Sequence, residues 1–192
     1  RNLAIKITSI SDNADIKKYF SRMISNNAFA LKEHLREGVN VEELDLTGDE
    51  IKEIETYEHK TSYLSMCMYK KLDQMKREGL LSEETYITID VNLKSFSDIT
   101  GSCERIKNTP IPYSYSMFFK KFIFIYVTTL PLAFVYSFGY YSSLVSIFVF
   151  YVLVSMEILA EEIEDPFGKD DNDLPTDALS QKIKENVQEI LR

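Results

Sequence analysis

Two long apolar runs, separated by a short uncharged break, constrain this chain more than any other feature. The runs are residues 122–138 and 144–160, the break is residues 139–143, and Glu157 is the only charged residue within this stretch. Each run approaches the roughly 20 residues that a helix needs to cross about 30 Å of hydrocarbon. An uncharged break between strongly charged flanks favours a membrane hairpin. A helical hairpin buried inside a large soluble protein is the alternative.

Basic residues just before the first run orient such a hairpin. Lys120 and Lys121 precede it directly, and Arg105 and Lys107 lie farther upstream. Positively charged flanks stay in the cytosol, and a hairpin returns to the side from which it entered. The sequence therefore predicts an all-α membrane protein. Residues 1–112 form a cytosolic helical region, residues 113–165 a two-helix transmembrane hairpin, and residues 166–192 an acidic loop and a C-terminal cytosolic helix.

Apolar periodicity predicts the helices of the polar regions. A stripe with spacings of three and four indicates an amphipathic helix over residues 16–35, with Asn13 among the possible N-caps. A second helix is expected from Asp49 past residue 57, and the pattern continues over residues 61–77. A third runs from Ser82 to Gly101, although its early part alternates as a strand would. The last helix begins after Pro175, with an apolar stripe of Leu179, Ile183, Val187 and Ile190.

Composition and spacing exclude several classes of function. The net charge of −8 gives no basis for binding nucleic acid. Cys67 and Cys103 match no metal or redox spacing. His34 and His59 are isolated in the sequence, so no zinc site is expected. No nucleophile motif, phosphate-binding loop or metalloprotease signature is visible, so the chain is predicted not to be an enzyme.

One segment, residues 165–173, offers a candidate cation site. Asp170, Asp171, Asn172 and Asp173 supply side-chain oxygens next to Gly168, and Ca²⁺ requires several oxygens around one centre. The spacing does not match the EF-hand pattern, and a solvated acidic turn that caps the final helix is the alternative. Glu157 also has two interpretations. An ionisable group at membrane depth must face protein or water and could have a functional role. The alternative is that Glu157 lies just beyond the hydrocarbon, at the cytoplasmic interface.

The beginning of the sequence suggests that more chain lies upstream. It starts at Arg1 in the middle of an apolar pattern rather than at a methionine, and it contains no tryptophan. Membrane proteins commonly place tryptophan at their interfaces. An N-terminal portion is therefore expected before Arg1.

Two motifs that flank the apolar runs resemble the bestrophin family, in particular its bacterial branch. They are CERIKNTPIPYSYS before the first run and LAEEIEDPFGKDDNDLP after the second. The resemblance covers residues 98–177 well and the upstream helices loosely. It implies a homopentameric ion channel whose subunits each contribute four transmembrane helices, with the two runs as the third and fourth. The first two would lie upstream of Arg1, and the channel would sit in the inner cell membrane with most of this chain in the cytosol.

The resemblance also assigns candidate site residues. Animal bestrophins are calcium-gated anion channels, and Asp170 and Asp173 match the two acidic ligands of their calcium clasp. Glu162 and Asp165 stand where the animal proteins carry amides, and Lys169 replaces an acid. These departures weaken the expectation that Ca²⁺ binds. A second constriction of the family's pore lies on the helix before the proline-rich turn, where Ile87 or Ile89 is the candidate.

Two functions are compatible with these observations. The first is a pore-forming subunit that conducts chloride or other anions, or cations, passively across the lipid bilayer. The second is a membrane-tethered interaction or scaffold protein that uses its acidic tail as a docking surface. The first predicts an oligomer with ion currents, and the second predicts a monomer or dimer that binds a basic partner.

Overall fold

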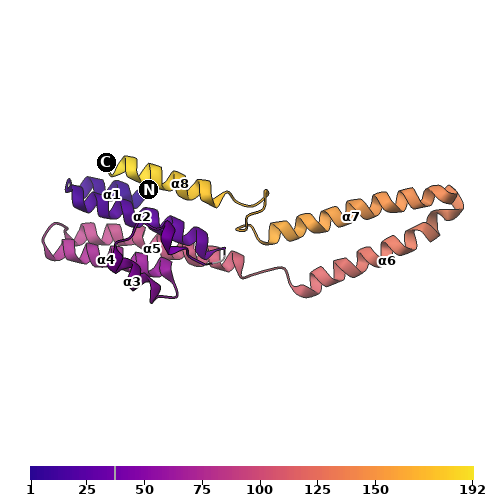
Figure 1. Ribbon diagram of the computed structural model, residues 1–192, viewed down its shortest axis with the longest axis horizontal. Coiled ribbons are helices and arrows are strands. Elements are labelled where there is room, and N and C mark those ends of the chain that lie inside the picture. The colour runs from indigo at the N-terminus through magenta and orange to yellow at the C-terminus, as the bar shows by residue number, and fades with distance from the viewer. Residues whose placement is uncertain (37) are drawn as a thin grey trace. The chain divides into compact units, whose positions relative to one another are not determined.

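The computed structural model describes residues 1–36 and 38–192, and every regular element in these ranges is helical. The chain contains α1 (Asn2–Ile10), α2 (Ala14–His34), α3 (Gly48–Glu55), α4 (Lys60–Arg77), α5 (Glu83–Lys107), α6 (Tyr113–Phe138), α7 (Ser142–Glu164) and α8 (Thr176–Ile190). Short 3₁₀ turns, η1 (Val41–Glu43) and η2 (Gly139–Tyr141), lie in two of the connections. Figure 1 shows the order of the elements along the chain.

The helices form two compact units, residues 1–106 with 175–192, and residues 107–174. We call them the bundle unit and the α6–α7 unit. The sequence places boundaries at residues 112/113 and 165/166 instead, which would group the acidic loop with the last helix. In the structure this loop lies with the α6–α7 unit, and Asn172 Nδ2 donates to Glu162 Oε2 on α7 at 2.7 Å.

Helix α2 is the centre of the bundle unit and packs against α1, α4 and α8 (Figure 1). Its N-terminus is capped by Asn13, whose side chain accepts hydrogen bonds from the amides of Asp15 and Ile16. Phe20 and Met23 are fully buried and share one core cluster with residues of the neighbouring helices. Burying such a side chain contributes about 1.5–3 kcal/mol, so the apolar stripe that predicts α2 also stabilises the bundle.

Two predictions about this unit were wrong in detail, and one helix was missed. The helix expected to run from Asp49 into residues 61–77 is interrupted, and α3 and α4 are separate helices. The third helix does not stop at Gly101 but continues to Lys107, because a glycine inside a helix costs only about 1 kcal/mol. The first helix, α1, was not predicted, yet its apolar side chains Leu3, Ala4 and Ile7 are all buried.

The strand-like alternation at the start of α5 is resolved by helical geometry. Ile89 and Leu93, one turn apart, are fully buried, whereas Ile87 is 58% exposed and Val91 is 66% exposed. Residues two apart lie on different faces of a helix, and residues four apart lie on the same face. The alternating apolar residues therefore supply one face to the core of the bundle and leave another uncovered.

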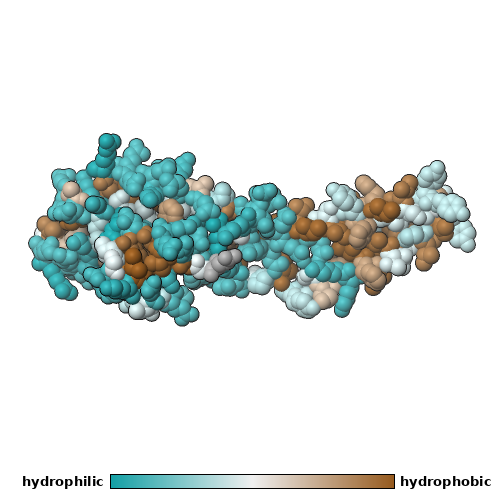
Figure 2. Space-filling model, viewed as in Figure 1, coloured by the Kyte–Doolittle hydropathy of each residue, from teal (hydrophilic) through white to brown (hydrophobic). Residues whose placement is uncertain are grey.

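The α6–α7 unit is built differently, because its apolar side chains face outward. The helical segment from Tyr113 to Glu164 is long and apolar enough to cross a membrane, and only 6% of its most apolar window is buried. Side chains such as Phe124 and Tyr136 are 73% and 98% exposed. Figure 2 shows apolar surface along these two helices, whereas the bundle unit is mostly hydrophilic on the same face.

The turn between α6 and α7 depends on Gly139. Its φ of +52° lies in the left-handed region, which only glycine adopts without strain. The Gly139 amide donates to the Val135 carbonyl and ends α6. Helices α6 and α7 then pack against each other, although Pro131 lies inside α6.

Candidate functional site

The acidic segment after α7 is a compact turn that satisfies its own polar groups. The Asp173 carboxylate accepts a hydrogen bond from the Asp170 amide at 2.7 Å, and the Asp173 amide donates to the Asp170 carbonyl at 3.0 Å. A β-carbon at Gly168 would lie 2.5 Å from Asp173 Oδ2, so a larger residue would displace the Asp173 carboxylate. The turn is therefore specified by Gly168 and Asp173 together.

The four acidic candidates for a calcium site do not converge in this structure. Glu162 Oε2 accepts from Asn172 Nδ2 at 2.7 Å, while Asp173 is engaged with the Asp170 backbone. Asp165 and Asp170 are exposed. Among the residues that the structure describes, no three carboxylates of the acidic loop lie close enough to share one ion. Ca²⁺ takes six to eight oxygens, which is more than this arrangement brings together.

Glu157, the charged residue within the apolar stretch, has a basic partner on the neighbouring helix. Its Oε1 lies 3.3 Å from the Lys120 Nζ, and the Glu161 Oε1 lies 2.6 Å from the same nitrogen. These two contacts of Lys120 join α6 to α7 near the basic residues that precede the first apolar run. The contact supports the interpretation that Glu157 faces protein near the charged end of the helices rather than lipid.

The proline-rich turn before α6 is attached at that same end. The Ile111 amide donates to Glu164 Oε1 at 2.9 Å, so the last turn of α7 holds the segment that carries Pro110 and Pro112. The two motifs singled out in the sequence, one on each side of the apolar runs, are thus in direct contact in the folded chain.

Comparison with known proteins identifies the family. The family model for bacterial and fungal bestrophin proteins matches residues 1–189. The chain belongs to the bestrophin family. The resemblance inferred from the two flanking motifs is therefore confirmed, and it extends over residues 1–189 of this chain rather than the central part alone.

Named relatives of this bestrophin include proteins described as channels. The voltage-dependent anion channel-forming protein YneE of Escherichia coli K12 is 30% identical over 179 residues, which are 92% of this chain and 59% of the relative. The voltage-dependent anion channel-forming protein alr2987 of Nostoc is 32% identical over 197 residues, covering 99% of this chain and 64% of the relative. The chain thus spans about three fifths of the length of these curated relatives.

A solved structure supports the same assignment. The crystal structure of a bacterial bestrophin homologue from Klebsiella pneumoniae superposes with a TM-score of 0.93 at 28% sequence identity. The match covers 99% of this chain and 72% of the Klebsiella chain. The all-helical fold predicted from the sequence is therefore that of a bestrophin.

The two candidates for the bestrophin pore constriction have different environments. Ile89 is fully buried in the core of the bundle unit, whereas Ile87 is 58% exposed. A residue that lines a pore must present its side chain to the axis. Of the two, Ile87 is free in this chain to face such an axis, whereas Ile89 packs in the core.

The helix that follows the acidic turn is held on the bundle by charged groups. Lys32, with a side chain only 5% exposed, places its Nζ 2.8 Å from Asp177 and 2.9 Å from Glu43. Burial alone would lower the pKa of Lys32, but its hydrogen bonds to Asp177, Glu33 and Glu43 outweigh burial and raise it. Lys32 is therefore a charged anchor between α2 and the first turn of α8.

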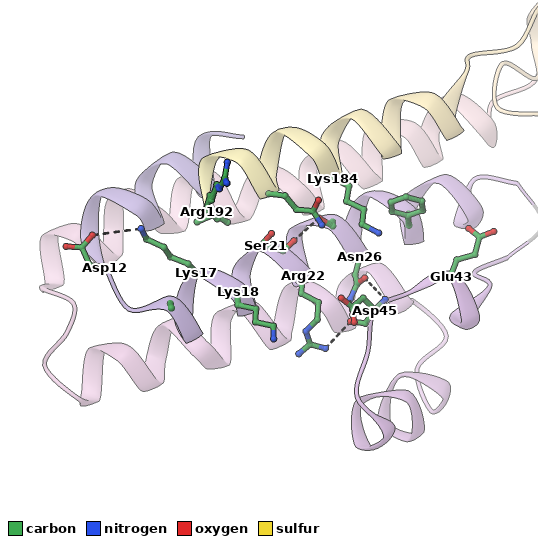
Figure 3. Close-up of a pocket in the computed structure, with 15 residues that line it drawn as sticks. Asp12, Lys17, Lys18, Ser21, Arg22, Asn26, Glu43, Asp45, Lys184 and Arg192 are labelled. Carbon is green, nitrogen blue, oxygen red and sulfur yellow. Dashed lines mark hydrogen bonds and ion pairs between the residues drawn. The ribbon is translucent and has the colours of Figure 1, made fainter.

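A cleft of about 390 Å³ lies along α2 and α8, with the connection near Asp45 at its edge (Figure 3). Basic side chains outnumber acidic ones among its lining residues, but several are already paired. Lys17 lies 3.9 Å from Asp12, and Arg22 donates to the Asp45 carbonyl at 3.0 Å. The Asn26 side chain donates to the same carbonyl at 2.8 Å. The hydrogen bonds in this cleft therefore mainly hold the connection between α2 and α3 against α2.

The expectation that no group of potential metal ligands includes the histidines was wrong. His34, His59 and Glu104 lie in three different parts of the bundle unit, yet their ligand atoms are within 4.8 Å of one another. His34 Nε2 lies 2.7 Å from Glu104 Oε1, and the two imidazole rings are 5.8 Å apart between centroids. Sequence spacing gave no signal, because the three residues are brought together only by the packing of the helices.

Proposed function

We propose that this chain is part of a pore-forming subunit of a bestrophin channel that conducts chloride and other small anions passively. The observation that carries the proposal is the match of nearly the entire chain to relatives named as anion channel-forming proteins. The acidic turn supports the scaffold alternative less well, because its carboxylates are engaged within the turn or exposed without a defined docking surface.

In this proposal α6 and α7 cross the inner cell membrane as a hairpin, and the bundle unit is cytosolic. Three features support the topology. The apolar side chains of α6 and α7 are exposed within their unit. The connecting turn carries no charge, and Lys120 and Lys121 stand at the opposite end of α6. Hydrocarbon covers outward-facing apolar side chains, and basic flanks remain in the cytosol.

Conduction requires several copies around one axis, and the proposed assembly is a homopentamer. An apolar stripe on α5 supports self-association, because it is uncovered in the single chain. Its members are each more than half exposed: Ile87, Val91, Ile99 and Ile106. We assign Ile87 to the cytosolic constriction and the remainder of the stripe to the axis or to contacts between copies.

The acidic turn is proposed to be a structural connection rather than a calcium gate. No three of its carboxylates converge in the part of the chain that the structure describes, and Asp173 caps the turn itself. Currents should therefore persist when a chelator removes Ca²⁺. Loss of current in the chelator, with restoration by added Ca²⁺ that fails in Asp173→Asn, would overturn this part of the proposal.

The decisive functional experiment is reconstitution of the full-length protein in planar bilayers under a chloride gradient. We expect single-channel currents whose reversal potential follows chloride, and a larger conductance for Ile87→Ala. Ile5→Ala is a matched control, because Ile5 is 54% exposed on α1 and has no assigned place at the axis. A pentamer that is silent under all ionic conditions would contradict the proposal. A reversal potential that follows the cation would support a channel but contradict the proposed anion selectivity.

A further inference from the structure

Three residues from separate elements of the bundle unit form a cluster that the channel function does not use. His34 is the last residue of α2, His59 stands at the N-cap of α4, and Glu104 is on the last turns of α5. Their potential ligand atoms all lie within 4.8 Å of one another. Two imidazoles and one carboxylate are a common donor set for Zn²⁺ in sites that keep one position open.

The cluster is accessible from solvent rather than sealed in the core. The side chains of His34 and Glu104 are 22% and 33% exposed, and His59 is exposed. His59 and Glu104 line a pocket of about 250 Å³, together with Thr61, Ser65 and Thr100. An ion can therefore reach the three ligands without opening the bundle.

A buried hydroxyl in the same pocket provides an independent indication of a missing ligand. Thr61 is 3% exposed, and its Oγ1 has no hydrogen-bond partner among the described residues. A buried polar group without a partner is normally destabilising. A water molecule held by a metal ion at the cluster would supply the partner that Thr61 lacks.

We propose that His34, His59 and Glu104 bind a divalent transition metal ion, with Zn²⁺ as the expected occupant and water as the fourth ligand. Zinc–nitrogen and zinc–oxygen bonds of roughly 2.0–2.1 Å place the ligand atoms of a tetrahedral site about 3.3 Å apart. His34 Nε2 and Glu104 Oε1, now at 2.7 Å, must separate slightly. The ligand atom of His59 lies within 4.8 Å of the other two, so it must approach by at most about 1.5 Å, and its side chain is exposed and free to rotate.

A bound ion would join the end of α2, the start of α4 and α5. The α5 helix carries the exposed stripe that we assign to the pore axis, so the ion would fix the helix from which that stripe projects. The binding proposal itself does not depend on channel activity. The metal content of the protein decides whether the site exists, whatever the currents show.

The test uses full-length protein in detergent, purified without a polyhistidine tag. After incubation with ZnCl₂ and desalting, elemental analysis should give about one zinc per subunit, and zinc-edge anomalous scattering should place it at the cluster. His59→Ala removes one ligand at an exposed position whose side chain makes no cap hydrogen bond, so folding should be retained. We expect a loss of affinity of at least about 100-fold for His59→Ala and for Glu104→Gln.

Glu58→Gln is the matched control, because Glu58 is the exposed neighbour of His59 and lies outside the cluster. It should bind zinc as the unmodified protein does. Absence of stoichiometric zinc from the unmodified protein would overturn the proposal. So would zinc that remains bound in both ligand variants, and in either case His34 and Glu104 would form an ordinary ion pair.

Discussion

Replacing Asp177 by asparagine tests how the helix after the acidic turn is held on the bundle. Asp177 Oδ1 lies 2.8 Å from the Lys32 Nζ, and its Oδ2 lies 2.9 Å from the Arg36 Nη1. Asparagine keeps the shape of the side chain and removes its charge. Lys32 retains Glu33 and Glu43, each at 2.9 Å, so the substitution leaves no buried cation without a partner.

The magnitude follows from the exposure of the two partners. Lys32 is 5% exposed, but the Asp177 side chain is 65% exposed, so solvent screens the pair strongly. Two screened ionic contacts are worth about 1 kcal/mol together. A further 0.3–1 kcal/mol, roughly, is lost because Asp177 lies in the first turn of α8, where the helix dipole favours negative charge. We therefore expect α8 to lose about 1–2 kcal/mol.

Hydrogen exchange read by mass spectrometry measures this loss locally. A loss of about 1–2 kcal/mol corresponds to exchange of the α8 amides that is faster by a factor of about 5–30 at neutral pH. Helix α4 should be unaffected, and Glu185→Gln, which removes a charge from an exposed position of α8, should change little. Unchanged exchange in α8, or equal acceleration in α4, would refute the assigned role of Asp177.

The pH dependence of the same difference has a definite sign. Hydrogen bonds from Lys32 and Arg36 lower the pKa of Asp177 below its ordinary value. Its contribution is therefore present above the unfolded pKa of about 3.9 and is lost as the pH falls through the lower folded pKa. The difference between the unmodified protein and Asp177→Asn should be constant near neutral pH and should vanish in acid.

Three further substitutions test the packing and the charged end of the apolar helices. Glu50→Gln removes the partner of Arg22, and thermal unfolding should show a loss of about 2 kcal/mol. Burial opposes ionisation of Glu50, but hydrogen bonds from Arg22 outweigh it and lower its pKa, so this stabilisation should disappear in acid. Val187→Ala, at a fully buried position, should cost about 2 kcal/mol at any pH in the same assay. Glu157→Gln should cost less than about 1 kcal/mol, because Lys120 keeps Glu161; a larger loss would indicate a role beyond pairing.

The elements with strong local signals could be predicted from the sequence. The two apolar helices are visible as uninterrupted runs, and Pro175 marks the start of α8. The break between α3 and α4 has no such signal, because no glycine or proline stands between residues 56 and 59. Gly101 gave a misleading signal for a helix end, because α5 continues through it to Lys107.

The candidate sites show the same limit. The acidic turn was identified from consecutive aspartates, but its hydrogen bonds depend on the approach of Asp173 to Gly168, which spacing does not reveal. The cluster of His34, His59 and Glu104 was missed because its members are distant in the sequence and meet only through tertiary packing. Local chemistry can be deduced from neighbouring residues, whereas convergence from three helices requires the fold.

Labelling of the turn between α6 and α7 tests the membrane topology most directly. In cells that express the full-length protein with Ser143→Cys, a membrane-impermeant thiol reagent applied from outside the inner membrane should modify position 143. The partly exposed Cys103 of the bundle unit should react only after the membrane is opened. Modification of Cys103 in intact cells, or of position 143 only after permeabilisation, would contradict a hairpin that crosses the membrane from a cytosolic bundle.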